Sequence, residues 1–263
     1  MAVINTNVAA TLTANALSRN DRAATQAMER LSTGLKINSA ADDAAGMAMS
    51  NTMTAQVKGL NMAVKNANDA ISMIQTADGA SIEIGDMLQR MRELGVQAVN
   101  GTLTDADRTQ LNLEYQQLMT EVTRVGTNTE WNGTALLAGS IGSSGTVTFQ
   151  IGDTAQTMNV AFGTLTAAGD LGLTGDITDS TNAAAAILDV DVAIVALNTQ
   201  RATYGAAINR LEHTVDNLSN VSMNTQAALS RIQDADYAAE STALAQTQII
   251  AQAGTAMLAQ ANQ

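Results

Sequence analysis

The chain has 263 residues, a formal net charge of −12, no cysteine, no proline and only one Trp, three Tyr and two Phe. The negative charge argues against nucleic-acid binding and against attraction to an anionic membrane surface. The absence of cysteine excludes disulfides and thiolate metal sites. No uninterrupted apolar run reaches the roughly 18 residues that span a membrane, and the N-terminus lacks the pattern of a cleaved signal peptide. We therefore expect no membrane-spanning helix and no cleaved leader.

Three helices are predicted in the first half of the chain, where apolar residues recur in steps of three and four. The first covers about residues 5–31. The second carries its apolar stripe from Val57 to Ala98. The third begins where Thr104 and Asp107 have the spacing of a capping box. Ala, Leu, Met and Gln, which favour helix, are frequent in all three segments.

The polar stretch STGLKINSAADDAAG, residues 32–46, separates the first two helices and places Asp42 beside Asp43. One interpretation is an acidic pair that binds a metal or transfers protons. Adjacent helical residues point about 100° apart, so two such carboxylates would not converge on one ion. The alternative is helix capping, because Ser39 and Asp42 have capping-box spacing and acidic residues in a first turn suit the helix dipole. We favour capping and predict an inter-helix joint.

The middle of the chain changes composition and period. No Lys or Arg occurs between Arg124 and Arg201, and ten of the 19 glycines lie within residues 126–175. Apolar residues alternate with polar ones on both sides of Gly152-Asp153. This pattern predicts a β-hairpin that pairs residues 146–151 with about 156–162. The segments that flank the hairpin are expected to form loops.

The C-terminal arm has the strongest period in the chain. Apolar residues from Ile187 to Leu218 follow alternating steps of three and four, broken only at Arg201, and the stripe resumes at Leu229. Sustained heptads of this kind predict a coiled coil. A continuous helix over residues 182–263 would be about 120 Å long. The expected fold is mainly α, with long antiparallel coiled-coil helices from both termini and a small central β-hairpin region.

No residue pattern indicates an enzyme, a cofactor site or a metal site. His213 is the only histidine, and we expect it on an exposed flank of the coiled coil rather than in a catalytic triad or zinc site. The segment DLGLTGDITD lacks the spacing of an EF-hand loop. Glu93 and Glu121 are near enough for ion pairs with the arginines of the second and third helices, which we expect on solvated faces. These arginines are Arg90, Arg92, Arg108 and Arg124.

Several long motifs resemble bacterial flagellin. In the N-terminal arm they are RLSTGLKINSAADDAAGMAMS, VKGLNMAVKNANDAISMIQTADGA, LQRMRELGVQAVNGT and EWNGTALL. In the C-terminal arm they are NRLEHTVDNL, SRIQDADYAAE and QIIAQAGTAMLAQANQ. The resemblance covers nearly all of residues 1–140 and 185–263. It implies a structural subunit that polymerises into the helical flagellar filament used for swimming.

The resemblance also implies a domain organisation. Residues 1–42 and 228–263 would form an inner terminal coiled coil with a connecting spoke, and residues 43–130 and 182–227 an outer helical rod. Residues 131–181 would form a short, surface-exposed hairpin and loop region, without the large outer domains of longer flagellins. Residues 32–46 match the family's connecting segment, which agrees with the joint predicted above.

Two sets of site residues follow from this interpretation. In flagellins that trigger the flagellin-sensing Toll-like receptor, recognition involves an LQRxRELxVQ segment and a Glu on the next helix, which correspond to Arg90, Leu94 and Glu114. The apolar residues of the terminal segments and the joint are predicted to form the assembly interface. They are Ile4, Val8, Leu12, Leu31, Leu35, Ile37, Ile232, Ile249, Ile250, Met257 and Leu258.

The expected partners are many copies of the same chain, a flagellar export chaperone that holds the C-terminal helix, the filament cap and the hook-associated proteins. The Toll-like receptor is a further expected partner. The implied location is extracellular, in the flagellum, after unfolded export by the flagellar type III system without a cleaved signal peptide. Flagellins usually continue past AQANQ with a short apolar tail, so we expect either a truncated chain or an inner wall that ends differently.

Three alternatives stay open at this point. The first is the hook–filament junction protein, a flagellin relative that should not form long filaments. The second is an enzyme carried on a flagellin scaffold, for which the middle segment is short and holds no histidine. The third is a generic coiled-coil adaptor, which would not explain the ordered motifs.

Overall fold

The structure is a computed structural model that describes residues 7–262, with side chains through Gln260. Its five helices within that range are α1 (Val8–Thr33), α2 (Ala44–Val99), α3 (Asp105–Asn128), α4 (Ser180–Gln233) and α5 (Tyr237–Asn262). The chain forms two compact units. The terminal unit comprises residues 1–58 and 222–263, and the central unit comprises residues 59–221. The mainly α fold with small strand pairs is confirmed, whereas the finer division into inner, outer and surface regions stays a prediction.

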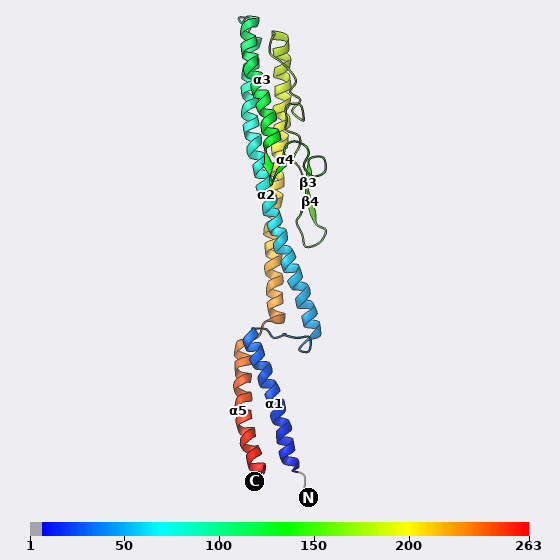
Figure 1. Ribbon diagram of the computed structural model, residues 1–263, viewed down its shortest axis with the longest axis vertical. Helices are drawn as coiled ribbons and strands as arrows, with labels where there is room; N and C mark the ends of the chain where they lie inside the picture. The colour runs from blue at the N-terminus through cyan, green and yellow to red at the C-terminus, as the bar shows by residue number, and fades with distance from the viewer. Residues whose placement is uncertain (1–6, 263) are drawn as a thin grey trace. The chain divides into compact units, whose positions relative to one another are not determined.

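The central unit is a helical bundle with a continuous apolar core. In it α2 and α4 run antiparallel, because Gly95 of α2 lies against Ile187 and Gly85 against Leu197. α3 packs beside both helices (Figure 1). The predicted heptad stripes face inward, since burying apolar side chains is the main favourable term in folding. The largest fully buried side chains include Tyr115, Tyr204, Phe162, Ile74, Ile84, Leu88, Met91 and Leu94.

The predicted β-hairpin is confirmed. β3 (Thr146–Gln150) pairs antiparallel with β4 (Thr157–Ala161), and Val147 lies opposite Val160. Alternation along β4 places Met158 and Val160 in the core. The hydroxyl of Tyr204 on α4 donates a hydrogen bond to the carbonyl of Phe162, just after β4, at 2.6 Å. Burial raises the pKa of the Tyr204 hydroxyl well above its ordinary value.

The middle segment is less exposed than the sequence suggests. Seven apolar side chains of residues 131–181, outside the hairpin, are almost completely buried in the core of the central unit. They are Leu136, Leu137, Phe162, Leu165, Leu171, Leu173 and Ile177. These side chains anchor the loops to the helices and close the core, while the placement of residues 131–181 on the surface of the filament stays a prediction. The glycine-rich sequence of the loops has no period, so it gave no sign of which side chains point inward.

A second, shorter hairpin is absent from the sequence predictions. β1 (Glu130–Trp131) pairs with β2 (Thr134–Ala135) across a two-residue turn. The turn residues Asn132 and Gly133 both have positive φ, 51° and 77°. These are the conformations of a type I′ turn, for which Asn-Gly is the preferred sequence. The Asn-Gly pair was therefore the available signal.

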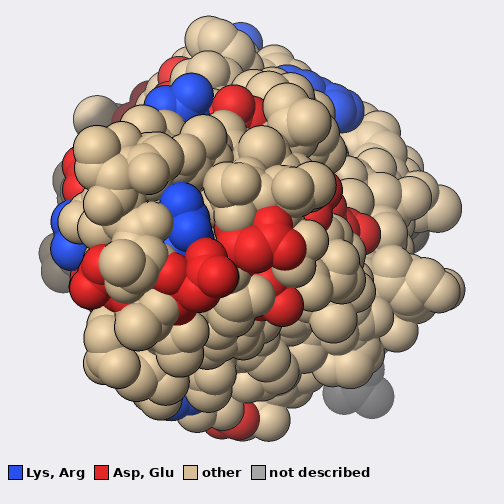
Figure 2. Space-filling model, turned by 90° about the horizontal axis from the view of Figure 1, so that it is seen from above, with Lys and Arg blue, Asp and Glu red and all other residues tan. Residues whose placement is uncertain are grey.

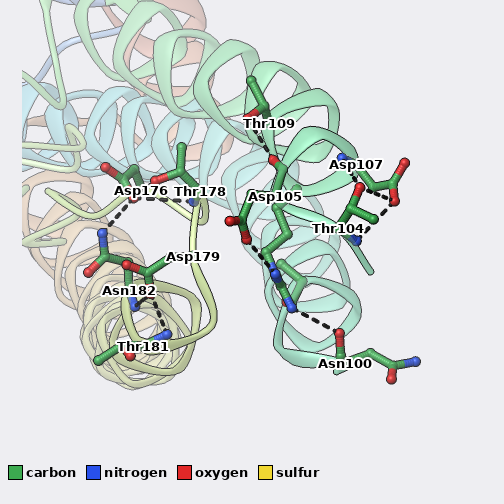
Figure 3. A network of polar contacts seen from close by, with 12 residues as sticks. Asn100, Thr104, Asp105, Asp107, Thr109, Asp176, Thr178, Asp179, Thr181 and Asn182 are labelled. Atoms are coloured by element: carbon green, nitrogen blue, oxygen red, sulfur yellow. Dashed lines mark hydrogen bonds and ion pairs between the residues drawn. The ribbon is translucent and has the colours of Figure 1, made fainter. Parts of the chain in front are cut away.

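The end of the central unit where α3 and α4 begin is held by a polar network (Figure 3). Thr104 and Asp107 form the predicted capping box, which is confirmed. At the start of α4, one oxygen of Asp179 accepts hydrogen bonds from the backbone N–H groups of Thr181 and Asn182. These contacts satisfy amide donors that a helix start leaves unpaired.

Arg108 in this network was expected on a solvated face, and that expectation is wrong. Its side chain is buried, and its guanidinium donates to the carbonyls of Ala98 and Asn100 and to the carboxylate of Asp105. Burying a guanidinium requires such partners, because an unpaired buried charge is costly. Arg108 therefore ties the start of α3 to the turn that precedes it.

The terminal unit contains α1 and α5, which lie side by side, with the start of α1 and the end of α5 together (Figure 1). The C-terminal arm is not one continuous helix. It breaks at residues 234–236, where Asp236 caps α5 by accepting hydrogen bonds from the N–H groups of Ala238 and Ala239. A polar cap at this position satisfies the amides of a new helix start.

By length and composition alone, α4 could cross a membrane, since it holds an 18-residue window with mean hydropathy 1.6 and at most two charged residues. The expectation of no membrane-spanning helix considered only uninterrupted apolar runs, and α4 contains no such run of 18 residues. A core helix meets the same criterion, and Val190, Ala193 and Leu197 of α4 are buried in the core of the central unit.

Candidate assembly surface and inter-helix joint

The joint between α1 and α2 begins with a left-handed glycine. Gly34 ends α1 at φ 73° and donates its N–H to the carbonyl of Arg30. Glycine adopts this conformation without the steric cost that a Cβ would add. The chain then pairs with the break between α4 and α5: the N–H of Lys36 donates to Gln233 and the N–H of Ala235 donates to Gly34. Two segments 200 residues apart in the sequence thus meet at one backbone pairing.

Asp42 and Asp43 have separate structural roles. One oxygen of Asp43 accepts the N–H groups of Ala45 and Gly46 and so caps α2. One oxygen of Asp42 accepts the N–H groups of Asn38 and Ser39, at 3.2 and 3.0 Å. Capping at this position is confirmed, but the cap is Asp43, and Ser39 instead belongs to the loop that Asp42 closes.

Electrostatics agree with this geometry. The hydrogen bond from the Ser39 backbone, followed by those from Gln26 and Asn38, lowers the pKa of the Asp42 carboxyl below its ordinary value of 3.8. Hydrogen bonds to a carboxylate favour its charged form. Asp42 therefore stays ionised and fastens the loop to α1 through Gln26, whose amide donates to the other carboxylate oxygen at 3.0 Å.

α1 and α5 are joined by a few polar contacts, two of them close to the joint. Arg30 and Glu240 form an ion pair at 2.9 Å, and both side chains are largely covered. The hydroxyl of Tyr237 donates to the carbonyl of Leu31 at 2.6 Å, and the side-chain amide of Asn20 donates to the carbonyl of Thr247 at 2.7 Å. These contacts set the register of the antiparallel pair.

Away from the joint, the ends of α1 and α5 carry no charged side chains. No charged side chain occurs before Arg19 or after Glu240. On the face shown in Figure 2, by contrast, Asp and Glu side chains form a band with Lys and Arg around it. Large apolar side chains are nevertheless exposed along the uncharged helix ends; the exposed fraction of Leu12 is 71 % and that of Ile249 is 66 %. Contiguous exposed apolar surface of this kind marks an interaction site.

The predicted assembly residues that the structure describes fall into three groups. Val8, Leu12, Ile249, Ile250 and Met257 are exposed. Leu31, Leu35, Ile232 and Leu258 are half-buried within the terminal unit. Ile37 is buried beside Gly46, so it packs the joint of its own chain, and Ile4 lies outside the described residues.

The three predicted receptor residues do not share one surface. Arg90 and Glu114 are exposed and form an ion pair at 2.9 Å, and Arg90 also pairs with Glu93 as expected. The side chain of Leu94 is 1 % exposed and packs in the core, out of reach of a partner protein. The apolar stripe from Ile84 to Ala98 already contained Leu94 and was the better guide to its position.

Arg124 and Glu121 form the expected ion pair on α3, and His213 is exposed, as expected. The arrangement as a whole is a stable helical bundle joined in sequence to a pair of helices with uncharged, exposed apolar ends. Such a design defines a self-associating structural protein, because the exposed apolar ends are stabilised only when another surface covers them.

Comparisons with known proteins identify the family. The model of the bacterial flagellin N-terminal helical region matches residues 4–141, and that of the C-terminal helical region matches residues 187–263. The flagellin of Halalkalibacterium halodurans is 44 % identical over 264 residues, which is 99 % of this chain and 96 % of that protein. The chain belongs to the bacterial flagellin family.

Solved structures agree. The crystal structure of Bacillus cereus flagellin matches with a TM-score of 0.53 and 32 % identity, over 63 % of this chain and 94 % of that one. A putative flagellar hook-associated protein from Vibrio parahaemolyticus matches with a TM-score of 0.62, over 73 % of this chain and all of that one. Its 13 % identity shows a common fold alone. The chain is thus a structural subunit of the flagellar filament, and the hook–filament junction alternative is not favoured.

Proposed function

We propose that this subunit polymerises through the uncharged, exposed ends of α1 and α5. The observation that carries the proposal is the combination of two facts: no charged side chain occurs in residues 1–18 or 241–263, and large apolar side chains are exposed on both described helix ends. Full burial of a Val, Leu, Ile or Met side chain contributes roughly 1.5–3 kcal/mol. Covering several of them at once offsets the cost of ordering a new subunit.

In the filament, α1 and α5 form the inner layer, and the helices of the central unit form the outer layer. Family membership and the uncharged helix ends support this arrangement, because a surface without charge suits a position buried among copies. A flagellar export chaperone holds the C-terminal helix before export, since the exposed apolar side chains of α5 need cover in the cell. The subunit leaves through the flagellar type III system, and the filament cap and the hook-associated proteins meet it at the two ends of the filament.

Seeded elongation tests the assembly surface. Purified monomer is mixed with short filament fragments at neutral pH, and growth is followed by light scattering and negative-stain electron microscopy. Leu12→Asp and Ile249→Asp should each abolish elongation, because a buried unpaired carboxylate is far costlier than an exposed one. Ala23→Asp is the matched control, since it adds the same charge at an exposed position of α1 between Arg19 and Glu29.

Uniform long filaments from the unaltered chain and from Ala23→Asp support the proposal. Normal elongation of both Leu12→Asp and Ile249→Asp would place the assembly surface elsewhere. Short, capped structures from the unaltered chain would instead favour the junction-protein alternative.

A second function is recognition by the flagellin-sensing Toll-like receptor through Arg90 and Glu114. The observation that favours it is their exposed ion pair between α2 and α3, within the segment that resembles the recognition motif. Leu94 is left out of this surface because it is buried. The Arg90→Ala, Glu114→Ala double variant should lose receptor signalling in a reporter cell assay. Arg124→Ala, Glu121→Ala removes another exposed ion pair of α3 and should signal normally.

A further inference from the structure

The sulfur chemistry of this chain is confined to methionine. The sequence has 13 methionines and no cysteine. Among the described methionines, Met73, Met91 and Met158 are buried in the core, whereas five others are exposed over 52–65 % of their surface. Accessible thioethers are the ones that oxidants convert to sulfoxide. The exposed five are Met28, Met49, Met62, Met223 and Met257.

Met49 has a setting that the other exposed methionines lack. It lies one helical turn from Met53, so both thioethers are on one side of α2. Together with Ala48, Thr52 and Gln56 they line a shallow surface hollow of about 380 Å³. Met53 is half-buried at the edge of this hollow. Two adaptable thioethers around an open hollow make a surface that can fit a partner closely.

The surroundings of this hollow carry no charge. No Asp, Glu, Lys or Arg occurs from Ala44 to Val57. Met62, in contrast, has Lys58 and Lys65 on its own helix face, one turn away on either side. Met28 precedes Glu29 and Arg30 directly. An exposed face without charge, in a chain that bears a net charge of −12, has the composition of a surface covered by another copy.

We propose that Met49 and Met53 form a peroxide-sensitive modification site whose oxidation weakens self-association of the subunit. The proposal rests on the filament-forming function and extends the assembly surface to the first turns of α2. The oxidant is hydrogen peroxide or an organic hydroperoxide. The thioether sulfur attacks one peroxide oxygen, the O–O bond breaks and an S–O bond forms. Sulfur loses two electrons, and the other oxygen leaves as water or an alcohol after taking up a proton.

Oxidation of the two methionines should weaken association between copies and leave the fold of the monomer unchanged. In the monomer a sulfoxide at Met49 stays in water, so its polar oxygen keeps its hydrogen bonds. Between two copies the same oxygen loses water without gaining a partner, and an unpaired buried polar group is costly. Assembled filaments should therefore also shield both thioethers from the oxidant.

Peptide mapping by mass spectrometry tests the chemistry. Monomer and preformed filaments are treated with the same dose of hydrogen peroxide. In the monomer, sulfoxide should form at Met49 and Met53 before Met73, Met91 and Met158, and in filaments the two sites should be protected at least roughly fivefold. Equal oxidation of the two sites in monomer and filament would show that no neighbouring copy covers this surface.

Seeded elongation tests the consequence. Oxidised wild-type monomer should elongate at least roughly tenfold more slowly than untreated monomer. Relative to its own untreated rate, the M49L/M53L variant should lose less elongation after peroxide than wild type does, because leucine is apolar, similar in volume and inert to the oxidant. M62L is the matched control, since it removes an exposed thioether that lies outside the proposed assembly surface, between Lys58 and Lys65, and it should stay as sensitive as wild type. Rescue by M62L instead, or no slowing at all, overturns the proposal but leaves the filament function intact; failure of untreated wild-type monomer to elongate overturns the filament function itself.

Discussion

The two units of this flagellin use apolar residues in opposite ways. The central unit buries large side chains such as Leu88, Phe162 and Tyr204 completely. The terminal unit buries few apolar side chains among its described residues, chiefly Ala27, Ile37 and Val57, while Leu12 and Ile249 face solvent. The central unit therefore holds its fold within one chain. The terminal unit leaves apolar surface exposed that becomes buried only when another protein surface covers it.

This difference teaches that helix content alone does not measure stability. α1 and α5 are as regular as α3, yet an amphipathic helix draws most of its stability from packing. A subunit that assembles into a filament has reason to keep its exposed apolar surface in one unit. Point substitutions in the two units should therefore differ in where they have their effect.

The largest expected effect is a cavity in the central core. Leu88→Ala removes a side chain with no exposed surface and should lower the free energy of unfolding of the central unit by about 2–5 kcal/mol. Urea unfolding followed by the fluorescence of Trp131, the only tryptophan, reports on this unit. Leu12→Ala shortens a leucine that is 71 % exposed and should leave that transition unchanged. A shift of similar size in both variants would mean that the units unfold together.

The next largest effect on stability is expected at a glycine that lies close to another part of the backbone. A Cβ on Gly126, near the end of α3, would meet the backbone carbonyl oxygen of Leu165. Gly126→Ala should therefore destabilise the central unit by about 1–3 kcal/mol, as overpacking does. Gly205→Ala is the matched control, because a Cβ on this α4 glycine meets no other atom. It should stabilise the same unit by roughly 0.5–1 kcal/mol, since alanine favours helix. Thermal unfolding followed by the fluorescence of Trp131 should give a lower midpoint for Gly126→Ala and a higher midpoint for Gly205→Ala. A shift in the same direction for both variants would contradict this interpretation.

The features that the sequence predicted are those with local causes. The β3–β4 hairpin follows from alternation around one turn, and the cap at Thr104 follows from the residue three positions later. The break before α5 was missed because residues 233–235 pair with residues 34–36, far away in the chain. Arg108 was misplaced for a related reason: its charge suggested solvent, and only the folded turn brings carbonyls to it.

The candidate assembly surface, too, could be predicted from the sequence only in part. The uncharged ends were visible in the sequence, and the resemblance identified them as assembly segments. Which of their residues are free for a partner depended on packing, which buries Ile37 and exposes Ile249. Leu94 illustrates the converse, because a motif taken from relatives suggested a contact while the heptad stripe correctly indicated the core. At Leu94 the apolar period was therefore the more reliable guide.

A smaller effect is expected at the joint. Asp43→Ala removes the carboxylate that accepts two N–H groups at the start of α2 and should cost about 0.5–2 kcal/mol of local stability. Because residues 1–58 belong to the terminal unit, the loss should appear as faster amide hydrogen exchange at Ala45 and Gly46. Asp43→Asn keeps an oxygen that can accept the same bonds and should restore most of the protection. Faster exchange throughout the core of the central unit would contradict a local role for this cap.

The smallest effect is a pH dependence confined to the terminal unit. The pKa of Asp42 is lowered from 3.8, first by the Ser39 backbone hydrogen bond and then by Gln26. A carboxyl whose pKa is lower in the folded chain stabilises that chain at pH values above 3.8, and the contribution disappears as the pH falls through the lower, folded pKa. Carbon-13 titration of the Asp42 carboxyl should show this midpoint below 3.8, and Gln26→Ala should raise it. If the midpoint is unchanged in Gln26→Ala, then α1 does not hold the loop through the contact between Gln26 and Asp42. The joint would in that case depend on its backbone pairing with residues 233–235 alone.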